Sequence, residues 1–258
     1  MKIISIAAIL SLAVGSVGAI FGGGVVERDM YTFMGSLRET EAGKTKCSAT
    51  LIGTKTMVTS VKCATSNVNY VVVGGRDSSG DPSGDGELRY IKNYTIHPSW
   101  KADESHYDVA VLQLEKEVSK PYARLPKSEK TDYGDVPSIV FGWGSLDRAK
   151  PEEIADSLHY LELTKFSYDT CKSKVKVDYF DTSFSCAGGS DENGVSLYDL
   201  GGPLITKSED KNVLIGILTY VDASDDFRNP SIFTRTMYLV SWFREMLLVH
   251  NDGYNGIW

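Results

Sequence analysis

Three short segments contain side chains from which acyl-transfer chemistry could be built: TSVKCA at 59–64, YDVAVLQL at 107–114 and LYDLGGP at 197–203. Attack on a carbonyl needs a hydroxyl nucleophile, an imidazole base, a carboxylate that orients the imidazole, and backbone donors for the oxyanion. Asp108 offers the carboxylate. Lys62 is protonated near neutral pH unless strongly desolvated, and Leu200 has no atom that can attack a carbonyl. Lys62, Asp108 and Leu200 together therefore offer an orienting group without a base or a nucleophile.

Two other side chains could in principle replace the missing groups. Ser196 lies four residues before Leu200, and His106 lies two residues before Asp108. A lone histidine on a loop is more often a surface residue than a general base. We therefore assign no catalytic role to His106.

The loop DSSGDPSGDGE, at 77–87, is the most polar segment of the chain. Asp77, Asp81, Asp85 and Glu87 could gather a calcium ion, but their spacing does not fit the EF-hand pattern, and solvated turn residues are the commoner explanation. The four cysteines form no Cys-x-x-Cys pair and have no histidines nearby. We therefore predict neither a metal nor a cofactor.

Asn93, in NYT, is the one usable N-glycosylation sequon, because Pro230 spoils the other. We expect a glycan at Asn93 if the chain is secreted.

The 258-residue chain begins with a segment typical of a secretory signal. In MKIISIAAILSLAVGSVGA a lysine precedes the apolar run, and Val17 and Ala19 have the spacing that a signal peptidase accepts. We expect residues 1–19 to be removed and the rest to be secreted. No later segment approaches the roughly 20 apolar residues of a membrane span. Loss of Lys2 changes the formal net charge from -7 to -8, which disfavours nucleic acid and anionic lipid as partners.

The remaining chain is predicted to be all-β. Runs rich in valine, isoleucine, tyrosine and threonine alternate with glycine-rich or charged turns. They are YTFMGSL, SATLIG, MVTSV, NYVVVGG, LRYIKNYTI and DVAVLQL, then IVFGWG, LHYLELTKF, PLIT, VLIGILTY and SIFTRTM. Six strands followed by at least five more indicate two similar β units. Only YLVSWFREMLLVH, near the end, has helical spacing.

These segments, in this order, resemble the trypsin-like serine proteases. CSATLIGTKTMVTSVKCA is similar to the family segment that carries the general-base histidine, and FGWG at 141–144 is similar to a strand of the family's second barrel. FSCAGG and LYDLGGP are similar to the segments around a disulfide and around the nucleophile. The resemblance implies two six-stranded antiparallel β-barrels, at about 20–120 and 130–236, within one domain at 20–258, and a terminal helix at about 237–250.

At the catalytic positions the resemblance implies a degenerate site. Lys62 stands at the histidine position, Asp108 at the aspartate position and Leu200 at the serine position. Loss of the nucleophile or the base costs on the order of 10⁶ in turnover. Tyr198 replaces the glycine of the oxyanion hole, and Ser196 replaces a cysteine, which indicates loss of one disulfide rather than a new nucleophile. We predict no catalytic residue, and an ion pair between Lys62 and Asp108 in place of the histidine–aspartate contact.

Gly194, six residues before Leu200, stands where trypsin-like members keep an acidic residue for basic side chains. The specificity pocket is therefore expected to be altered.

The resemblance also settles the cysteine pairing that composition leaves open. Four cysteines in an oxidising compartment allow three connectivities. The family pattern implies bonds between Cys47 and Cys63 and between Cys171 and Cys186.

The expected mature amino terminus is similar to that of the activated family members. Cleavage after Ala19 would expose IFGG, which resembles the family's IVGG. The resemblance then implies an ion pair between the Ile20 ammonium and Asp199.

Among inactive homologues, the chain is most similar to the glucanase inhibitor proteins of oomycetes. This resemblance implies a secreted effector that binds plant endo-β-1,3-glucanases and suppresses elicitor-triggered defence, with contacts on loops such as 77–87 and 221–229. The alternatives are a non-enzymatic cofactor in an extracellular proteolytic or immune cascade and, less favoured, an active serine endopeptidase.

Overall fold

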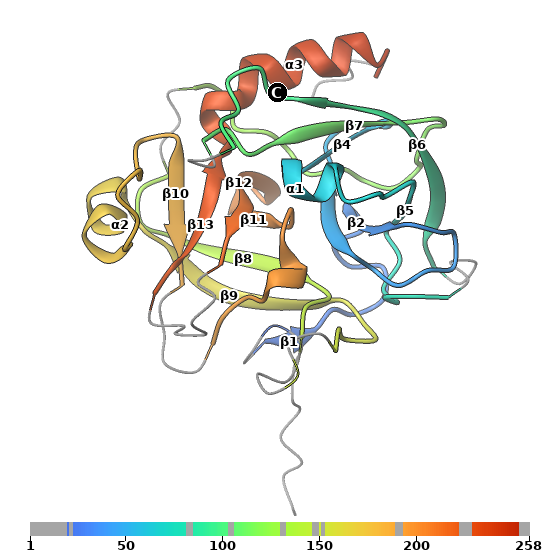
Figure 1. Ribbon diagram of the computed structural model, residues 1–258, viewed down its shortest axis with the longest axis horizontal. Helices are drawn as coiled ribbons and strands as arrows, with labels where there is room; N and C mark the ends of the chain where they lie inside the picture. Colours follow the sequence, from blue (N-terminus) through green and yellow to red (C-terminus); the bar gives the residue numbers. More distant parts are fainter. Residues whose placement is uncertain are drawn as a thin grey trace, which may run out of the picture.

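The computed structural model describes residues 20, 23–80, 85–102, 106–129, 133–145, 150, 153–188, 193–221 and 229–252. The predicted signal at 1–19 lies outside these ranges. Figure 1 shows two barrels side by side, the first in blue to green and the second in yellow to red, with a helix across the top. Among the described residues, no helix combines the length and the apolar character needed to cross a bilayer.

The first barrel is closed by six antiparallel strands in the order β2-β3-β4-β7-β6-β5. Their bounds are β2 Met34–Arg38, β3 Cys47–Leu51, β4 Thr56–Thr59, β5 Tyr70–Val73, β6 Glu87–Ile96 and β7 Ala110–Leu114. Closure comes from pairing of β2 with β5. Strands β2, β3 and β4 are buried on both faces, because their outer sides are covered by other parts of the molecule.

The second barrel has the order β9-β10-β13-β12-β11-β8 and closes through β8 and β9. Its strands are β8 Val136–Gly142, β9 His159–Lys165, β10 Phe184–Ala187, β11 Pro203–Ser208, β12 Lys211–Tyr220 and β13 Ser231–Arg235. The two-residue strand β1, Gly24–Val25, adds to β9 from outside the ring. The predicted all-β fold of two six-stranded barrels is confirmed.

The helices differ in part from the expectation that only the end is helical. The terminal helix α3, Val240–Val249, follows the 3-10 turn η3, Thr236–Leu239. Two short helices were not predicted: α1, Val61–Ala64, and α2, Tyr168–Lys174. With four and seven residues they are too short to show helical periodicity, and the serines that cap their first turns are their main local signal. As a result, the predicted strand MVTSV ends at Thr59.

Both predicted disulfides are present, Cys47–Cys63 in the first barrel and Cys171–Cys186 in the second. The Cys47–Cys63 bond ties α1 to β3, and the Cys171–Cys186 bond ties α2 to β10. Each bond therefore holds a short helix against the wall of its own barrel.

Aromatic side chains fill part of the contact between the barrels. The rings of Tyr31 and Phe33, just before β2, lie 4.4 and 5.9 Å from the ring of Phe141 on β8. Phe33 and Phe141 are almost completely buried. This packing holds the two barrels in one arrangement, which in turn places the site residues of both halves together.

Candidate functional site

The candidate site lies where the two barrels meet, beside α1 (Figure 1). Asp108, just before β7, is 6% exposed. Its Oδ1 accepts a hydrogen bond from the backbone N–H of Val61 at 2.7 Å, and its Oδ2 accepts one from the hydroxyl of Thr219 on β12. The carboxylate thus joins α1 of the first barrel to a strand of the second.

Burial raises the pKa of the Asp108 carboxyl, while the hydrogen bonds from Thr219 and Val61 and the nearby charge of Lys62 act in the opposite direction. Thr219 was not singled out in the sequence. The available signal was its hydroxyl, which directly follows the apolar run VLIGIL at 213–218. A buried hydroxyl usually has a hydrogen-bond partner.

Lys62 lies in α1 and is the one exposed residue of that four-residue helix. Among the residues that the structure describes, its ammonium forms no ion pair within 4 Å, so the expected ion pair with Asp108 is not formed. The physical reason is that Asp108 faces inward to Val61 and Thr219, whereas Lys62 extends toward solvent.

Leu200 lies at the end of a 3-10 turn, η2, Leu197–Asp199, and is 5% exposed. Its carbonyl oxygen accepts from the N–H of Ser48 at 3.1 Å and lies 3.3 Å from Sγ of Cys63. The position of the family's nucleophile therefore rests on the first barrel, next to the disulfide behind α1.

The two backbone donors that would form the oxyanion hole are both used within η2. The N–H of Tyr198 donates to Oγ of Ser196 at 3.3 Å, and the N–H of Leu200 donates to the carbonyl of Leu197 at 3.4 Å. Oxyanion stabilisation needs donors aimed at the reacting atom. This arrangement was not predicted, because it depends on the path of the backbone.

Neither possible replacement is placed for catalysis. Oγ of Ser196 caps η2 and also accepts from the N–H of Ser145 at 3.1 Å. Nε2 of His106 lies 3.1 Å from Oδ2 of Asp181, and its ring packs 4.9 Å from that of Phe184. His106 therefore contacts the second barrel rather than the carboxylate of Asp108.

Asp199 is the most deeply buried carboxylate near the site, at 1% exposed. It accepts from the N–H of Gly144 at 2.8 Å and from the N–H of Ser196 at 2.7 Å, and burial raises its pKa to about 6. A Cβ on Gly142 or Gly144 would collide with this carboxylate. The FGWG segment thus provides the space that Asp199 occupies.

Ile20 is completely buried, and its backbone nitrogen is part of a peptide bond here. A chain of contacts connects Ile20 to the glycine segment that surrounds Asp199. Gly23 donates to the carbonyl of Ile20 and packs on Tyr160, which pairs with Phe141, the residue before Gly142. The ion pair of a free Ile20 ammonium with Asp199 stays a prediction.

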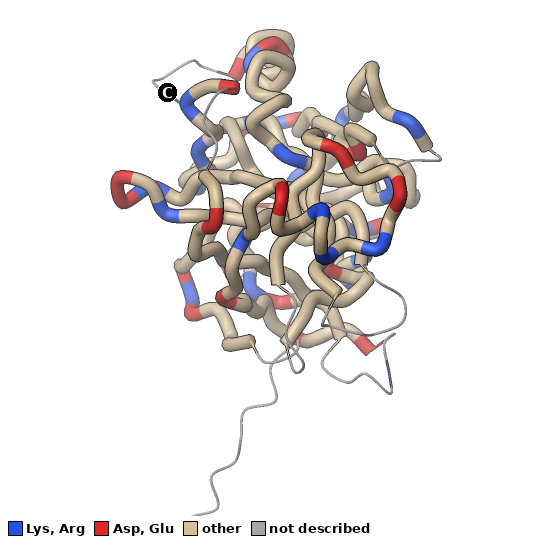
Figure 2. Tube along the Cα trace, turned by 90° about the vertical axis from the view of Figure 1, so that its left-hand side faces the viewer, with Lys and Arg blue, Asp and Glu red and all other residues tan. Residues whose placement is uncertain are grey.

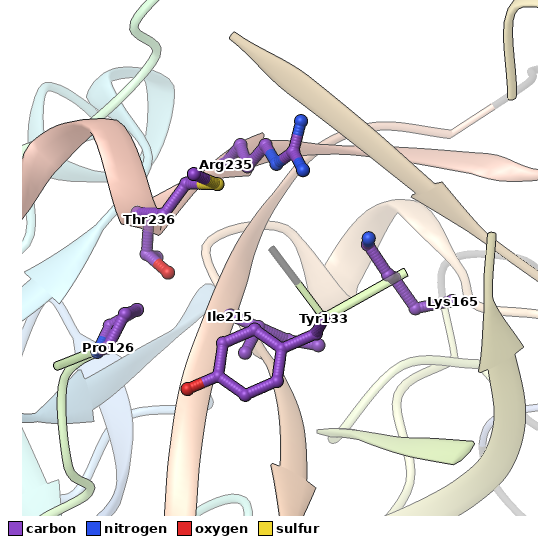
Figure 3. A pocket seen from close by; sticks show the side chains of 7 residues that line it. Pro126, Tyr133, Lys165, Ile215, Arg235 and Thr236 are labelled. Atoms are coloured by element: carbon purple, nitrogen blue, oxygen red, sulfur yellow. The ribbon is translucent and has the colours of Figure 1, made fainter. Parts of the chain in front are cut away.

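The second barrel contains several cavities, one of which is lined by Gly194 and Val195, directly before the residue that caps η2. A cavity of 240 Å³ is lined by Leu163, Asn193 and Gly194 among others, and one of 400 Å³ by residues of β8, β9 and β11. Figure 3 shows a third, where Pro126 and Thr236 face Lys165, whose ammonium donates to the carbonyl of Gly134 at 2.9 Å. Its volume of 10 Å³ is room for about one water molecule.

Two of the carboxylates considered for calcium form ion pairs instead. Asp85 pairs with Arg28, and Glu87 pairs with Arg89, whereas Asp81 lies outside the described residues. Asn93 is exposed on β6 at a β-bulge, which leaves its amide accessible, and its glycosylation stays a prediction.

Two closed six-stranded barrels, with Asp108 and the η2 turn where they meet, define the chymotrypsin-like class of serine-protease folds. The family model named Trypsin matches residues 20–243, and the chain belongs to the trypsin family.

Its relatives include inhibitors as well as enzymes. Glucanase inhibitor protein 3 of Phytophthora sojae is 29% identical over 96% of this chain and 99% of its own length. Glucanase inhibitor protein 2 of Phytophthora infestans is 28% identical over 95% of this chain and 98% of its own length. Chymotrypsin-like elastase family member 1 of Bos taurus is 27% identical over 78% of each chain.

Proposed function

We propose that this chain is a secreted, catalytically inactive trypsin homologue that binds and inhibits a plant endo-β-1,3-glucanase. The observation that carries the inhibitor function is the similarity to two glucanase inhibitor proteins along almost the whole length of both chains. By blocking release of glucan elicitors, such an inhibitor would suppress plant defence.

Three features of the site support the absence of catalysis. Leu200 has no nucleophilic atom, and Lys62 holds an amine where the mechanism needs an imidazole. The N–H groups of Tyr198 and Leu200 are engaged within η2, so restoring the two side chains alone would leave the oxyanion without its donors. The remaining function for such a rigid fold is recognition.

Titration of a plant endo-β-1,3-glucanase with the purified chain beginning at Ile20 tests the proposal. We expect glucanase activity on a soluble β-1,3-glucan to fall in a saturable way, while a thermally unfolded sample has no effect. The same preparation should not hydrolyse peptide esters. Unchanged activity of a panel of plant glucanases would contradict the inhibitor function. Ester hydrolysis that is lost on substitution of residues at this site would contradict the inactivity.

A further inference from the structure

We propose that Lys62 is the cationic anchor of the binding surface and that it pairs with a carboxylate on the partner protein. The inference rests on the proposed function, because it names the surface and the chemistry by which the same partner is bound. Four observations carry it: the rigid support of Lys62, its uncommitted ammonium, the exposed apolar residues on the elements that meet α1, and the charge of the chain as a whole.

Lys62 is presented by one of the most constrained segments of the molecule. Ser60 caps α1 by accepting from the N–H of Cys63 at 3.3 Å, and Cys63 is bonded to Cys47 on β3. The N–H of Val61 is held by Asp108 at 2.7 Å. Because the backbone is already ordered, binding through Lys62 would add no cost for ordering the backbone of α1.

The ammonium of Lys62 is not neutralised by a direct contact. Within the described ranges it has neither a hydrogen bond nor an ion pair, unlike Lys46, which pairs with Glu39, and Lys127, which pairs with Glu209. The carboxylate of Asp108, whose pKa burial raises and the charge of Lys62 lowers in part, accepts its hydrogen bonds from Val61 and Thr219. An incoming carboxylate would therefore meet a cation that has no bond to lose.

Exposed apolar residues lie on the elements that meet α1. Thr219 binds Asp108, so Tyr220, the next residue of β12, belongs to the segment at this contact, and it is 36% exposed. Leu200 touches Cys63, which brings the η2 turn next to α1, and Leu197 at the start of that turn is 49% exposed. Interface hot spots typically combine a charged side chain with nearby aromatic and aliphatic residues.

The overall charge makes a local anchor necessary. The chain has 34 acidic and 27 basic residues, so its general field does not attract an acidic surface. Figure 2 shows positions of Lys and Arg interspersed with positions of Asp and Glu along the backbone on the side of the second barrel. A partner carboxylate would thus be selected by Lys62 itself rather than by long-range attraction.

Binding of variants to an immobilised plant endo-β-1,3-glucanase tests the proposal, with thermal melting of each variant as a check of folding. We expect Lys62→Glu to weaken binding by roughly tenfold or more, because the new carboxylate would face the carboxylate of the partner and repel it. Lys62→Met, which only removes the charge, should weaken binding less. Lys62→Arg should stay close to the wild type. The matched control is Lys116→Glu, which makes the same charge change on a side chain 77% exposed, at the far end of β7 from Asp108.

Two further measurements separate charge from shape. The difference between wild type and Lys62→Met should shrink as salt rises, because exposed charges are screened. Leu197→Ser should weaken binding at every salt concentration. If the wild type binds and Lys62→Glu binds equally well, the proposal that Lys62 anchors the partner is wrong and the proposed function stands. If the wild type binds no glucanase, both the proposed function and the role of Lys62 are contradicted.

Discussion

At the scale of single residues, Asp108 retains a structural role although the groups it would orient in a protease are absent. Its two oxygens hold the first residue of α1 and a strand of the second barrel, and Oγ1 of Thr234 donates to its backbone carbonyl at 3.1 Å. A buried carboxylate with such partners is costly to remove, because each donor left without an acceptor loses its hydrogen bond and does not regain water.

Asp108→Ala should therefore lower the free energy of unfolding by roughly 2–4 kcal/mol, from the stranded N–H of Val61 and hydroxyl of Thr219. Asp108→Asn, which keeps one acceptor, should cost less. Urea unfolding of both variants measures this, with Asp178→Ala as the exposed control. Equal losses for Asp108→Ala and Asp178→Ala would mean that the two contacts do not stabilise the fold.

At the scale of elements, the segment after α3 fastens the end of the chain to the first barrel. Asp252, 4% exposed, accepts from the hydroxyl of Thr54 at 2.5 Å, from the N–H of Lys55 at 2.7 Å and from the hydroxyl of Thr56. Nδ1 of His250 lies 2.9 Å from the same hydroxyl of Thr56. The turn between β3 and β4 is thus completed by residues almost 200 positions later in the chain.

Asp252→Ala should destabilise the protein by roughly 2–4 kcal/mol, since it leaves three donors of that turn without their acceptor. Glu245→Ala, on the exposed side of α3, is the matched control and should change stability by less than about 0.5 kcal/mol. Thermal melting of both variants checks the difference. A loss for Asp252→Ala no larger than that for Glu245→Ala would show that the segment is not needed to hold α3.

At the scale of the whole molecule, the buried carboxylate of Asp199 makes stability depend on how the chain begins. Its pKa of about 6 lies above its ordinary value near 3.8. A raised carboxyl pKa means that the group's contribution to stability is full below the unfolded value and is lost as pH rises through about 6. A free ammonium on Ile20 would favour the charged form and remove that loss.

A chain beginning at Ile20 should therefore be more stable at pH 7 than one beginning at Ala19, by about 1–3 kcal/mol. The difference should shrink as pH falls from 7 to 4, because Asp199 becomes protonated in the chain that begins at Ala19, and shrink again above about pH 8, where the amine loses its charge. Denaturant unfolding of the two chains at each pH measures it. Asp199→Asn in both chains should abolish the pH dependence of this difference, and a difference that is the same at pH 4 and pH 7 would contradict the ion pair.

The sequence predicted the barrels well because their strands read as short β-branched runs, and the resemblance supplied both disulfide pairs. Lys62, Asp108 and Leu200 were likewise expected near one another. The engaged amides of Tyr198 and Leu200 could not be foreseen, because a backbone N–H carries no residue-type signal. The inward turn of Asp108 toward Thr219, rather than toward Lys62, depends on a strand more than 100 residues away.

The bond between Asp252 and the turn at Thr54–Thr56 also has a consequence for biosynthesis. All six strands of the first barrel have left the ribosome once residue 114 has emerged, yet one of their turns lacks its acceptor until residue 252 follows. The nascent chain should therefore hold an incompletely secured barrel through most of its synthesis. Stop codons placed before residue 252 should yield products that proteases digest readily, even when both sets of strands are complete.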